Sequence, residues 1–360
     1  MNKHHYVAIM AGGIGSRFWP VSRTRLPKQF LDILNTGDTL LQATYKRFSS
    51  IIPEENIFVV TFNEYAPLVK SQLPGIPAEN ILSEPSRKNT APCVAYMAFK
   101  LQQIDPEASF IVAPSDQLIL DTPGFIKICQ DALHFVDHHD SLLTLGIKPT
   151  YPNTGYGYIQ YESESVEDNI YPVKTFTEKP NLELAKAFIS SGDFLWNAGI
   201  FAWKASVILH AFEKFLPEMF DVFSTEKDLF GTEHEKEAID RIYPQCVNIS
   251  IDYGIMEKAD NVFIIPSSFG WSDLGTWNSA YENMDKDYLG NAIKGANVMV
   301  IDATRNMVHA ENNKMVLLQG LDDFVVVDTS DVLLICKKDK EQEIKEYMAE
   351  VKRNKGDKYL

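Results

Sequence analysis

The sequence predicts an α/β fold in which helices cover both faces of a central, mostly parallel sheet. Short apolar, β-rich runs alternate with stretches of helical periodicity through the first half of the chain. Parallel strands need a long crossover, usually a helix, and become buried on both faces. After about Gly290 the pattern changes to short β runs, which predicts a small second domain. We therefore expect two domains, residues 1–288 and residues 289–360.

The elements of the first half follow from these patterns in order. Buried strands are predicted at Val7–Met10, Ile57–Thr61, Phe110–Ala113 and Leu142–Ile147. The helices between them are predicted at Leu40–Ile52, Ala91–Ile104 and Phe125–Val136. In such sheets ligands bind beyond the carboxyl ends of the strands, so the residues just after each strand are candidates for function.

The second half of the chain has a different residue pattern. Turns rich in Gly, Tyr and Asn occupy Tyr151–Trp203, as expected for an inserted substrate-binding region, and helices return between Ala205 and Arg241. The short strands of the tail are predicted at Asn297–Ile301, Met307–Ala310, Lys314–Leu318, Phe324–Asp328 and Val332–Cys336. A charged helix with one apolar face then closes the chain.

The composition limits the class of protein. The chain has 360 residues, 45 % of them hydrophobic, and a formal net charge of -15. This acidic balance disfavours general binding to nucleic acid or to an anionic membrane surface. Neither a signal-peptide pattern nor a membrane-spanning apolar stretch is evident in the sequence. The four cysteines are widely spaced, which predicts free thiols in a reducing cytoplasm.

The stretch from Ala11, AGGIGSRFWPVSRTRLPKQ, is the most informative part of the chain. Three glycines follow the first predicted strand, and the cations that come next are Arg17, Arg23, Arg25 and Lys28. Glycines let a backbone approach a ligand and present N–H donors, while Arg and Lys supply counter-charge. The pattern predicts a loop for a nucleoside triphosphate. The alternative is an ordinary glycine turn followed by solvated basic residues.

Two common phosphate loops do not fit this stretch. A Walker loop needs Lys followed by Ser or Thr after its last glycine, but here Gly15 is followed by Ser16 and Arg17. The dinucleotide-binding pattern needs a third glycine where this chain has Phe18. A different kind of phosphate loop is therefore expected.

Two aspartates follow predicted strands through tight turns. Asp116 comes after the strand that ends at Ala113, and Asp273 comes after a strand at Val262–Ile265. Magnesium prefers one or two carboxylates together with phosphate oxygens, so the two aspartates could hold one Mg²⁺. The alternative for Asp116 is a turn or helix cap, and for Asp273 it is the cap of a short helix through Trp277.

The segment Glu84–Pro92, EPSRKNTAP, is predicted to begin a helix. Asn89 or Thr90 suits the N-cap and Pro92 suits the first turn, but capping does not account for Arg87. A helix N-terminus at a sheet edge also provides a polar site for a base or a phosphate.

Three segments of the middle region indicate a sugar site. They read NTGYGYI from Asn153, TEKP from Thr177 and WNAGI from Trp196. Glycines beside polar groups suit a sugar, whose hydroxyls need donors and acceptors against an apolar floor. Glu178 would accept hydrogen bonds from the sugar and Lys179 would pair with a phosphate. The alternative for these two residues is an exposed ion pair before a proline turn.

Taken in order, these segments resemble the sugar-nucleotide pyrophosphorylases, and among them the bacterial mannose-1-phosphate guanylyltransferases (GDP-mannose pyrophosphorylases). The series covers nearly the whole chain: AGGIGSRFWPVSRTRLPKQF, EPSRKNTAP, PSDQ, GYGYI, EKP, WNAGIF, SIDYGIMEK and WSDLGTW. Family members usually have PSDH and often WNSG, where this chain has Gln117 and Ala198. The resemblance implies a Rossmann-like nucleotidyltransferase domain with a mixed, mostly parallel sheet. It also implies a small, left-handed β-helix-like C-terminal domain that ends in a helix.

The resemblance implies roles for residues at matching positions. Arg17 and Lys28 would be catalytic, because they neutralise charge as pyrophosphate leaves. Asp116 and Asp273 would bind Mg²⁺. The residues implied in nucleotide binding are Ala11, Gly12, Gly13, Gly15, Arg87, Asn89, Thr90 and Ser115. The residues implied in sugar-phosphate binding are Gly155, Glu178, Lys179, Asn197 and Asp252.

The implied reaction transfers the nucleotidyl group of GTP to α-D-mannose 1-phosphate and gives GDP-mannose and pyrophosphate. The anionic sugar phosphate attacks the α-phosphorus in line, so no general base or covalent intermediate is required. The family and the β-rich tail favour a homodimer. Two alternatives stay open: a pyrophosphorylase for another pair, such as glucose 1-phosphate with dTTP, and a non-catalytic, nucleotide-sensing regulatory subunit.

Overall fold

The computed structural model describes residues 1–311 and 314–360, and the chain divides into two compact units. The first unit comprises Met1–Gly12, Thr44–Ser115 and Ile119–Trp271. The second comprises Gly13–Ala43, Asp116–Leu118 and Ser272–Leu360. Most of the glycine-rich stretch and the turn at Asp116 therefore belong to the same unit as the C-terminal strands. Each unit is assembled from three separate segments of the chain, whereas the predicted domains are two contiguous ones.

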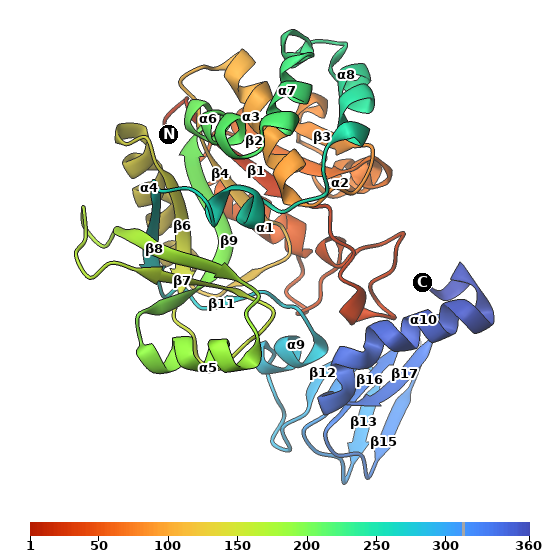
Figure 1. Cartoon of the computed structure of the whole chain (residues 1–360). Coiled ribbons are helices and arrows are strands. Elements are labelled where there is room, and N and C mark those ends of the chain that lie inside the picture. Colours follow the sequence, from red (N-terminus) through yellow and green to blue (C-terminus); the bar gives the residue numbers. More distant parts are fainter. Residues whose placement is uncertain (312–313) are drawn as a thin grey trace. The chain divides into compact units, whose positions relative to one another are not determined.

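A nine-stranded mixed sheet forms the centre of the first unit (Figure 1). The strand order is β3-β2-β1-β4-β9-β6-β10-β8-β7. The bounds are β1 His5–Met10, β2 Ile57–Phe62, β3 Ile81–Glu84, β4 Ser109–Pro114, β6 Leu142–Ile147, β7 Gly157–Tyr161, β8 Tyr171–Glu178, β9 Phe194–Lys204 and β10 Val262–Ser267. The strands β3, β2, β1 and β4 are parallel, as are β6 and β10, whereas β9 runs antiparallel to β4 and β6. The predicted mixed α/β sheet is confirmed.

Helices cover both faces of this sheet. The helices of the first unit are α2 Ala66–Gln72, α3 Thr90–Ile104, α4 Thr122–His138, α5 Leu182–Ser191, α6 Ala205–Phe215, α7 Pro217–Ser224 and α8 Glu235–Ile242. Tyr6 and Ala8 of β1 belong to the core that α3, α6 and α7 complete. Val7 and Ile9 point to the opposite face and are fully buried as well. Burial on both faces explains why β1 is a continuous apolar run.

The second unit contains the tail strands and the early segment. A four-stranded sheet has the order β12-β14-β16-β17, and β13 pairs with β15. The bounds are β12 Ala292–Lys294, β13 Val298–Ile301, β14 Met307–Ala310, β15 Val316–Gln319, β16 Phe324–Asp328, β17 Leu333–Lys337, α9 Trp277–Asn283 and α10 Ile344–Lys355. The pairs β12–β14, β14–β16 and β13–β15 are parallel with short connections, which gives the β-helix-like architecture. Phe18, Trp19 and Ile33 pack in one core with Trp277 and Val325.

Three elements lie where the chain passes from one unit to the other. They are α1 Leu40–Phe48, β5 Leu118–Ile119 and β11 Trp271–Ser272. The helix predicted at Leu40–Ile52 ends four residues early, at Phe48, because Ser49, Ser50 and the following proline turn stop it.

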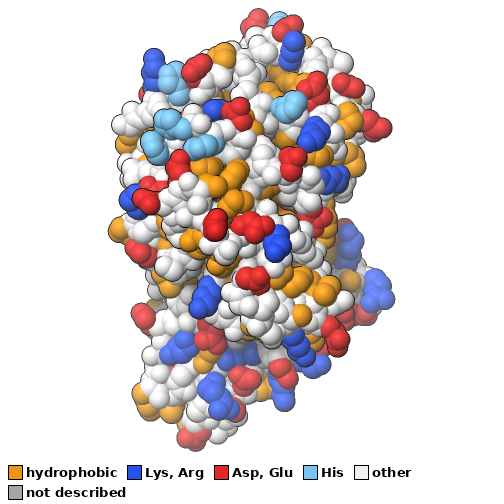
Figure 2. All heavy atoms as spheres, turned by 60° about the vertical axis from the view of Figure 1, so that its left-hand side comes forward, with side chains coloured by type: hydrophobic (Ala, Val, Ile, Leu, Met, Phe, Trp, Pro, Cys, Tyr) orange, Lys and Arg blue, Asp and Glu red, His pale blue; other side chains and the backbone are white. Residues whose placement is uncertain are grey.

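Two surface properties bear on function. Within the described residues, no helix is both long and apolar enough to cross a bilayer. On the face drawn in Figure 2, Lys and Arg side chains are interspersed with Asp and Glu rather than gathered into one broad basic area. That distribution agrees with the acidic composition.

Candidate active site

The glycine-rich loop presents backbone donors and withdraws its carbonyl oxygens. The amide of Gln29 donates to the Gly13 carbonyl at 2.9 Å, and the Ser22 hydroxyl donates to the Ile14 carbonyl at 2.6 Å. The N–H groups of Gly13 and Gly15 donate no hydrogen bond to the described protein atoms. An anion meets donors rather than acceptors at such a loop. Such a loop has the donors that a phosphate would require.

Gly15 is required by both its backbone and its neighbour. Its φ is +68°, in the left-handed region that favours glycine. A Cβ at this position would collide with the Cβ of Lys28, whose stem runs directly over the glycine. The glycine therefore makes room for Lys28 as well as forming the turn.

Lys28 connects the two predicted metal-binding turns within the second unit. Its Nζ lies 3.0 Å from Oδ2 of Asp116. The same Nζ donates to the backbone carbonyls of Asp273 at 3.0 Å and Leu274 at 2.9 Å. Lys28 is 3 % exposed, whereas the Asp116 side chain is 35 % exposed. Two turns that are far apart in sequence are thus joined by one buried cation.

The two aspartates fit a hard divalent cation. Both supply carboxylate oxygens, the ligands that Mg²⁺ prefers, and Asp116 keeps part of its carboxyl group exposed. No cluster of three or more His, Cys, Asp or Glu side chains able to hold a metal occurs among residues 1–311 and 314–360. The protein would therefore provide two carboxylates at most, and phosphate oxygens and water would complete the shell, as is usual for magnesium. Helix α9 is capped by Thr276 and not by Asp273, so the capping alternative for Asp273 is wrong.

The cations of the glycine-rich stretch have different environments. Arg23 is 6 % exposed and bonds both oxygens of Asp331, at 3.1 and 2.6 Å, so it ties this stretch to the β17 end of the second unit. Arg17 has no hydrogen bond or ion pair with the described residues, although its charge interacts with Glu341 and Lys345. Its guanidinium donors could therefore serve an anionic ligand, while Arg23 is structural.

A buried carboxylate, Glu84, lies beside the first glycine of the loop in the first unit. Glu84 ends β3 and accepts a short hydrogen bond from the Tyr243 hydroxyl through Oε1. Its Oε2 lies 3.5 Å from the place where a Cβ of Gly12 would be. Burial raises the pKa of Glu84 to about 7. The segment EPSRKNTAP contains Glu84 but does not indicate its role, because its partner Tyr243 is distant in the chain.

The other residues of this segment are placed as follows. Asn89 caps α3 through Oδ1, which accepts from the Thr90 N–H at 3.0 Å, and its φ is +67°. The Thr90 hydroxyl accepts from the Ile251 N–H at 2.9 Å. Arg87 donates to the Tyr65 hydroxyl and lies over the Phe62 ring. Asn89 and Thr90 therefore stabilise the start of α3, and the Arg87 guanidinium lies against two neighbouring aromatic rings, Phe62 and Tyr65.

The backbone groups of Ala11 and Ser115 are hydrogen-bonded at the carboxyl-terminal ends of β1 and β4. The N–H of Ala11 donates to Val60, and its carbonyl accepts from the Thr61 hydroxyl. The N–H of Ser115 donates to Met10, and its carbonyl accepts from the Thr44 hydroxyl. These bonds fix where the loop after β1 and the turn after β4 begin.

The predicted sugar residues converge in the first unit. The Asn197 amide donates to Oδ1 of Asp252 at 2.8 Å. Asp252 opens a short π-helical turn, Asp252–Met256, an element that is frequent at functional sites. Burial, with Glu178 nearby, raises the pKa of Asp252 to about 6. One oxygen of Glu178, Oε2, is buried without a hydrogen-bond partner among the described residues. This unused acceptor points to a ligand that donates there.

Lys179 and the glycines of NTGYGYI complete this group. Lys179 has a φ of +50° and pairs with Oε1 of Glu178 at 2.6 Å. Gly155 is exposed, and Asn153 is the one described residue outside its chain neighbours that lies within 4 Å of a Cβ placed there. At Gly157, by contrast, a Cβ would collide with Oε2 of Glu178 and approach Asn197 to 3.2 Å. Gly157 is therefore the glycine that makes room for Glu178 and Asn197. The sequence pattern did not indicate this glycine.

An aromatic wall accompanies these polar groups. The Trp196 ring has edge-to-face contacts with Tyr151 and Tyr156, both with centroids 5.1 Å apart, and Tyr156 also contacts Trp271. The Trp196 indole N–H is buried without a partner among the described residues. An aromatic wall beside unused polar atoms is suited to a sugar ring.

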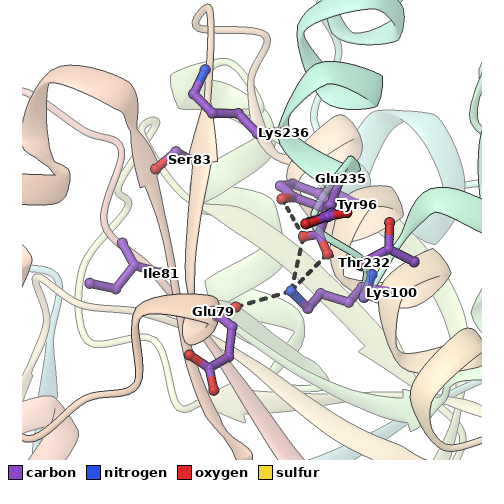
Figure 3. A pocket seen from close by; sticks show the side chains of 10 residues that line it. Glu79, Ile81, Ser83, Tyr96, Lys100, Thr232, Glu235 and Lys236 are labelled. Carbon is purple, nitrogen blue, oxygen red and sulfur yellow. Dashed lines mark hydrogen bonds and ion pairs between the residues drawn. The ribbon is translucent and has the colours of Figure 1, made fainter.

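A separate hollow of about 250 Å³ lies at the β3 edge of the first unit (Figure 3). Its wall contains a buried group in which Lys100 contacts both oxygens of Glu235 at 2.9 Å, and Tyr96 donates to Glu235 at 2.6 Å. Lys100 also donates to the Glu79 carbonyl, and Glu235 also accepts from the Gly231 N–H. Because these charges satisfy each other, the group is a structural tie and not a ligand site.

Comparison with known proteins places the chain in a family. Residues 6–288 match the nucleotidyl transferase family, and residues 296–351 match the mannose-phosphate isomerase/GMP-like β-helix domain. The chain belongs to the nucleotidyl transferase family. Members of this family generally use a divalent metal.

The relatives match over nearly the whole chain. Mannose-1-phosphate guanylyltransferase RfbM of Salmonella typhimurium is 35 % identical over 356 residues, which cover 98 % of this chain and 73 % of that protein. Alginate biosynthesis protein AlgA of Pseudomonas aeruginosa is 35 % identical over 343 residues, which cover 94 % of this chain and 70 % of that protein. A crystal structure from Thermus thermophilus, described as a mannose-1-phosphate geranyltransferase, superposes with a TM-score of 0.86 at 28 % identity and covers 97 % and 99 % of the two chains.

Proposed function

We propose that this chain is a mannose-1-phosphate guanylyltransferase, which forms GDP-mannose and pyrophosphate from GTP and α-D-mannose 1-phosphate. The observation that carries the proposal is the junction at Lys28, where two aspartate turns meet beside a loop of free N–H donors. A buried cation, two carboxylates and backbone N–H donors are groups that can stabilise the charge that develops in a reaction at a polyphosphate. The relatives that match nearly the whole chain include proteins named for this reaction.

The proposed chemical step is a single in-line displacement. An oxygen of the mannose 1-phosphate bonds to the α-phosphorus of GTP, and the bond from that phosphorus to the bridging oxygen of pyrophosphate breaks. The attacking oxygen is already anionic, so no side chain need remove a proton. The N–H groups of Gly12, Gly13 and Gly15 would bind the phosphates, and Arg17 would offset charge on the leaving pyrophosphate. Mg²⁺, held by Asp116 and Asp273, would supply further positive charge for the phosphate oxygens.

The guanine preference is supported by Glu84. In its ionised form, Glu84 would accept hydrogen bonds from the N1–H and the amino group of guanine; Oε1 already accepts from Tyr243, and Oε2 lies on the side of Gly12. Adenine offers no N1–H donor beside such an amino group, so this carboxylate would discriminate against ATP. Arg87, Asn89 and Thr90 lie in the same segment and stay predicted neighbours of the base.

The sugar side is supported by unused polar atoms. Oε2 of Glu178 has no partner among the described residues and would accept from a sugar hydroxyl. Asn197 keeps one amide proton for the ligand after it donates to Asp252. Lys179 would pair with the sugar phosphate, and the aromatic wall at Trp196 would form the floor.

We also propose a cytoplasmic homodimer. The second unit exposes apolar side chains on its small strands, with Met299 49 %, Ile301 44 % and Leu317 56 % exposed on β13 and β15. A second copy of the chain would cover this strip. The cysteines form no disulfide, which supports a reducing compartment. Analytical ultracentrifugation of the wild type and of Met299→Glu tests the dimer: a monomeric wild type contradicts it.

The decisive experiment measures pyrophosphate release with Mg²⁺ for each nucleoside triphosphate, paired with mannose 1-phosphate or glucose 1-phosphate. Release with GTP and mannose 1-phosphate alone is expected. Release with another pair of substrates would support the same mechanism with a different substrate specificity. Folded protein that binds nucleotide but releases no pyrophosphate with any pair would be a regulatory subunit.

A further inference from the structure

The hydroxyl of Tyr243 is the hydrogen-bond partner of the buried Glu84 carboxyl group. Tyr243 is fully buried and donates to Oε1, whereas Oε2 has no hydrogen bond with the described residues and lies on the side of Gly12. All three residues belong to the first unit. One oxygen of the carboxyl group is therefore fixed from inside the protein, and the other lies beside the first glycine of the loop.

The chain around Tyr243 fixes the position of its ring. Tyr243 begins a short 3₁₀ turn, Tyr243–Gln245, directly after α8, and its ring packs in the core that α3 completes. Lys88, in the same segment as Glu84, donates to the Pro244 carbonyl at 3.2 Å and ties that turn to the start of α3. Because the ring is packed on all sides, its hydroxyl points in one direction and gives the Glu84 carboxyl group a fixed orientation.

Of the two partners, Glu84 is the one that changes its charge near neutral pH. Burial, opposed by the hydrogen bond from Tyr243, raises the pKa of Glu84 to about 7. Burial raises the pKa of Tyr243 well above 10, so its hydroxyl keeps the proton and stays a donor. The titratable side chains beside this pair in the described part of the chain are Cys93, Tyr96 and Cys246, whose pKa values are also raised by burial, so they stay neutral.

The position of the proton decides what Oε2 can offer to a base. When Oε1 accepts from Tyr243, the proton of a neutral Glu84 resides on Oε2, which then presents a donor. Guanine has two adjacent donors, the N1–H and the amino group, and a donor that meets a donor is repelled. The ionised carboxyl group presents acceptors instead. A hydroxyl that stabilises the ionised form of Glu84 therefore favours guanine.

We propose that Tyr243 is a positioning residue for base selection, which acts through Glu84 by holding Oε1 and leaving Oε2 as an acceptor for guanine. The inference rests on the proposed function, since it concerns the base of that reaction. Tyr243 is fully buried, so it does not touch the nucleotide itself. Loss of its hydroxyl should weaken the binding of GTP and spare that of ATP, which has no N1–H for Glu84.

The first test measures the binding of GTP and of ATP to the wild type and to Tyr243→Phe between about pH 6 and pH 8.5. The readout is the Kd for ATP divided by the Kd for GTP, because ionisation of the triphosphate affects both nucleotides alike. At pH 7 this ratio is expected to be about tenfold lower in Tyr243→Phe, the scale of one hydrogen bond to a charged group. It should also reach its plateau at a higher pH than in the wild type, since the carboxylate has lost a donor.

Tyr96→Phe is the matched control for this variant. It removes the hydroxyl of another buried tyrosine in the same core, but the carboxylate that this hydroxyl serves is Glu235. The ratio and its pH dependence should therefore match those of the wild type. A folded Tyr243→Phe that keeps the wild-type ratio and pH profile, or that weakens GTP and ATP equally, would overturn the inference.

A second measurement shows whether Tyr243 acts through Glu84. In a Glu84→Ala background the carboxyl group is absent, so Tyr243→Phe should not change the ratio further. An equal fall of the ratio with and without Glu84 would overturn the inference. The wild type alone gives a test that requires no folded variant: its ratio should rise between about pH 6 and pH 8, and a constant ratio over this range would also overturn the inference.

Failure of the proposed function has a different signature. A wild type that binds GTP no better than ATP even at about pH 8.5 would contradict the guanine preference, and the role of Tyr243 would fall with it. A wild type that prefers GTP but forms no GDP-mannose with mannose 1-phosphate and Mg²⁺ would contradict only the proposed reaction. The binding ratios do not depend on turnover, so they judge the role of Tyr243 by themselves.

Discussion

The Asn197 amide is fixed at both ends by hydrogen bonds inside the first unit. Its nitrogen donates to Asp252 at 2.8 Å, while its oxygen accepts from the Gly199 N–H at 3.0 Å and lies 3.2 Å from the Thr144 hydroxyl. An amide held in this way cannot flip, so the direction of its remaining N–H is set by the fold. Asp252 therefore controls the presentation of Asn197 from a buried position.

Asp252→Ala is predicted to raise KM for mannose 1-phosphate about tenfold, which corresponds to about 1.4 kcal/mol, the scale of one hydrogen bond with a charged partner. KM for GTP should change little, because the hydrogen bond that the substitution removes orients a sugar residue. Steady-state kinetics with each substrate varied in turn measures the two KM values separately. Thr144→Val, which removes one bond to the same amide oxygen, should move KM in the same direction by less. Equal changes in both KM values would argue against a role specific to the sugar.

Stability should fall with rising pH because of Glu84. Burial raises its pKa from 4.5 to about 7, so the folded protein keeps a proton that the unfolded chain releases. The stabilisation is complete below pH 4.5 and is lost as the pH rises through 7. Glu84→Gln imitates the protonated form. Its free energy of unfolding minus that of the wild type should therefore be larger at pH 8 than at pH 5, by up to about 3 kcal/mol. Thermal unfolding at both pH values measures the difference, and a pH-independent difference would mean that Glu84 does not hold its proton.

Asp116→Asn and Asp273→Asn are each predicted to lower kcat by about 10²-fold or more, the scale of losing one preorganised electrostatic contact. The amide keeps the size of the side chain and removes the charge that a divalent cation requires. Raising Mg²⁺ should recover part of the loss, so rates are measured across a metal titration. Near-normal turnover of well-folded variants at low Mg²⁺ would remove both residues from the metal site.

Much of the fold is local in origin and could be predicted. The strand Leu142–Ile147 and the tail strand Phe324–Asp328 have the predicted bounds, because buried apolar runs between turns have few alternatives. The end of α1 was missed, since a helical pattern continues to Ile52 while the chain already turns at Ser49. Nor did any local pattern indicate that the glycine-rich stretch packs in one unit with the C-terminal strands.

The sequence indicated which residues belong to the site better than it indicated how those residues contact one another. The family resemblance indicated Asn197 and Asp252, and the structure joins them directly. It could not indicate that Lys28 is buried on Asp116, because burial depends on packing against residues about 245 positions away, at the Asp273 turn. Gly157 was missed for the same reason, since the choice between two glycines in NTGYGYI is decided by Glu178 on the neighbouring strand.

Gly15→Ala is predicted to destabilise the protein and to disturb Lys28. The new methyl group would collide with the Lys28 stem, and alanine disfavours the φ of +68°. A loss of about 1–3 kcal/mol in the free energy of unfolding is expected. Gly13→Ala is the control for stability, because no described atom lies within 4 Å of its Cβ position and its φ is not positive. Equal unfolding temperatures for the two variants would contradict this account of Gly15.

The hollow at the β3 edge provides a test of a structural ion pair. Lys100→Met would leave Glu235, which is 8 % exposed, without its buried counter-charge and should cost about 3–5 kcal/mol. Among the described residues, Glu235 would then keep two donors, the Tyr96 hydroxyl and the Gly231 N–H. The double variant Lys100→Met/Glu235→Gln should recover most of that loss, because it removes the stranded charge and keeps an acceptor for Tyr96. Chemical denaturation of the two variants measures the recovery, and kcat well below the unfolding range should match the wild type in both. A variant that keeps its stability but loses activity would show that this hollow takes part in function after all, since a purely structural tie affects turnover only through folding.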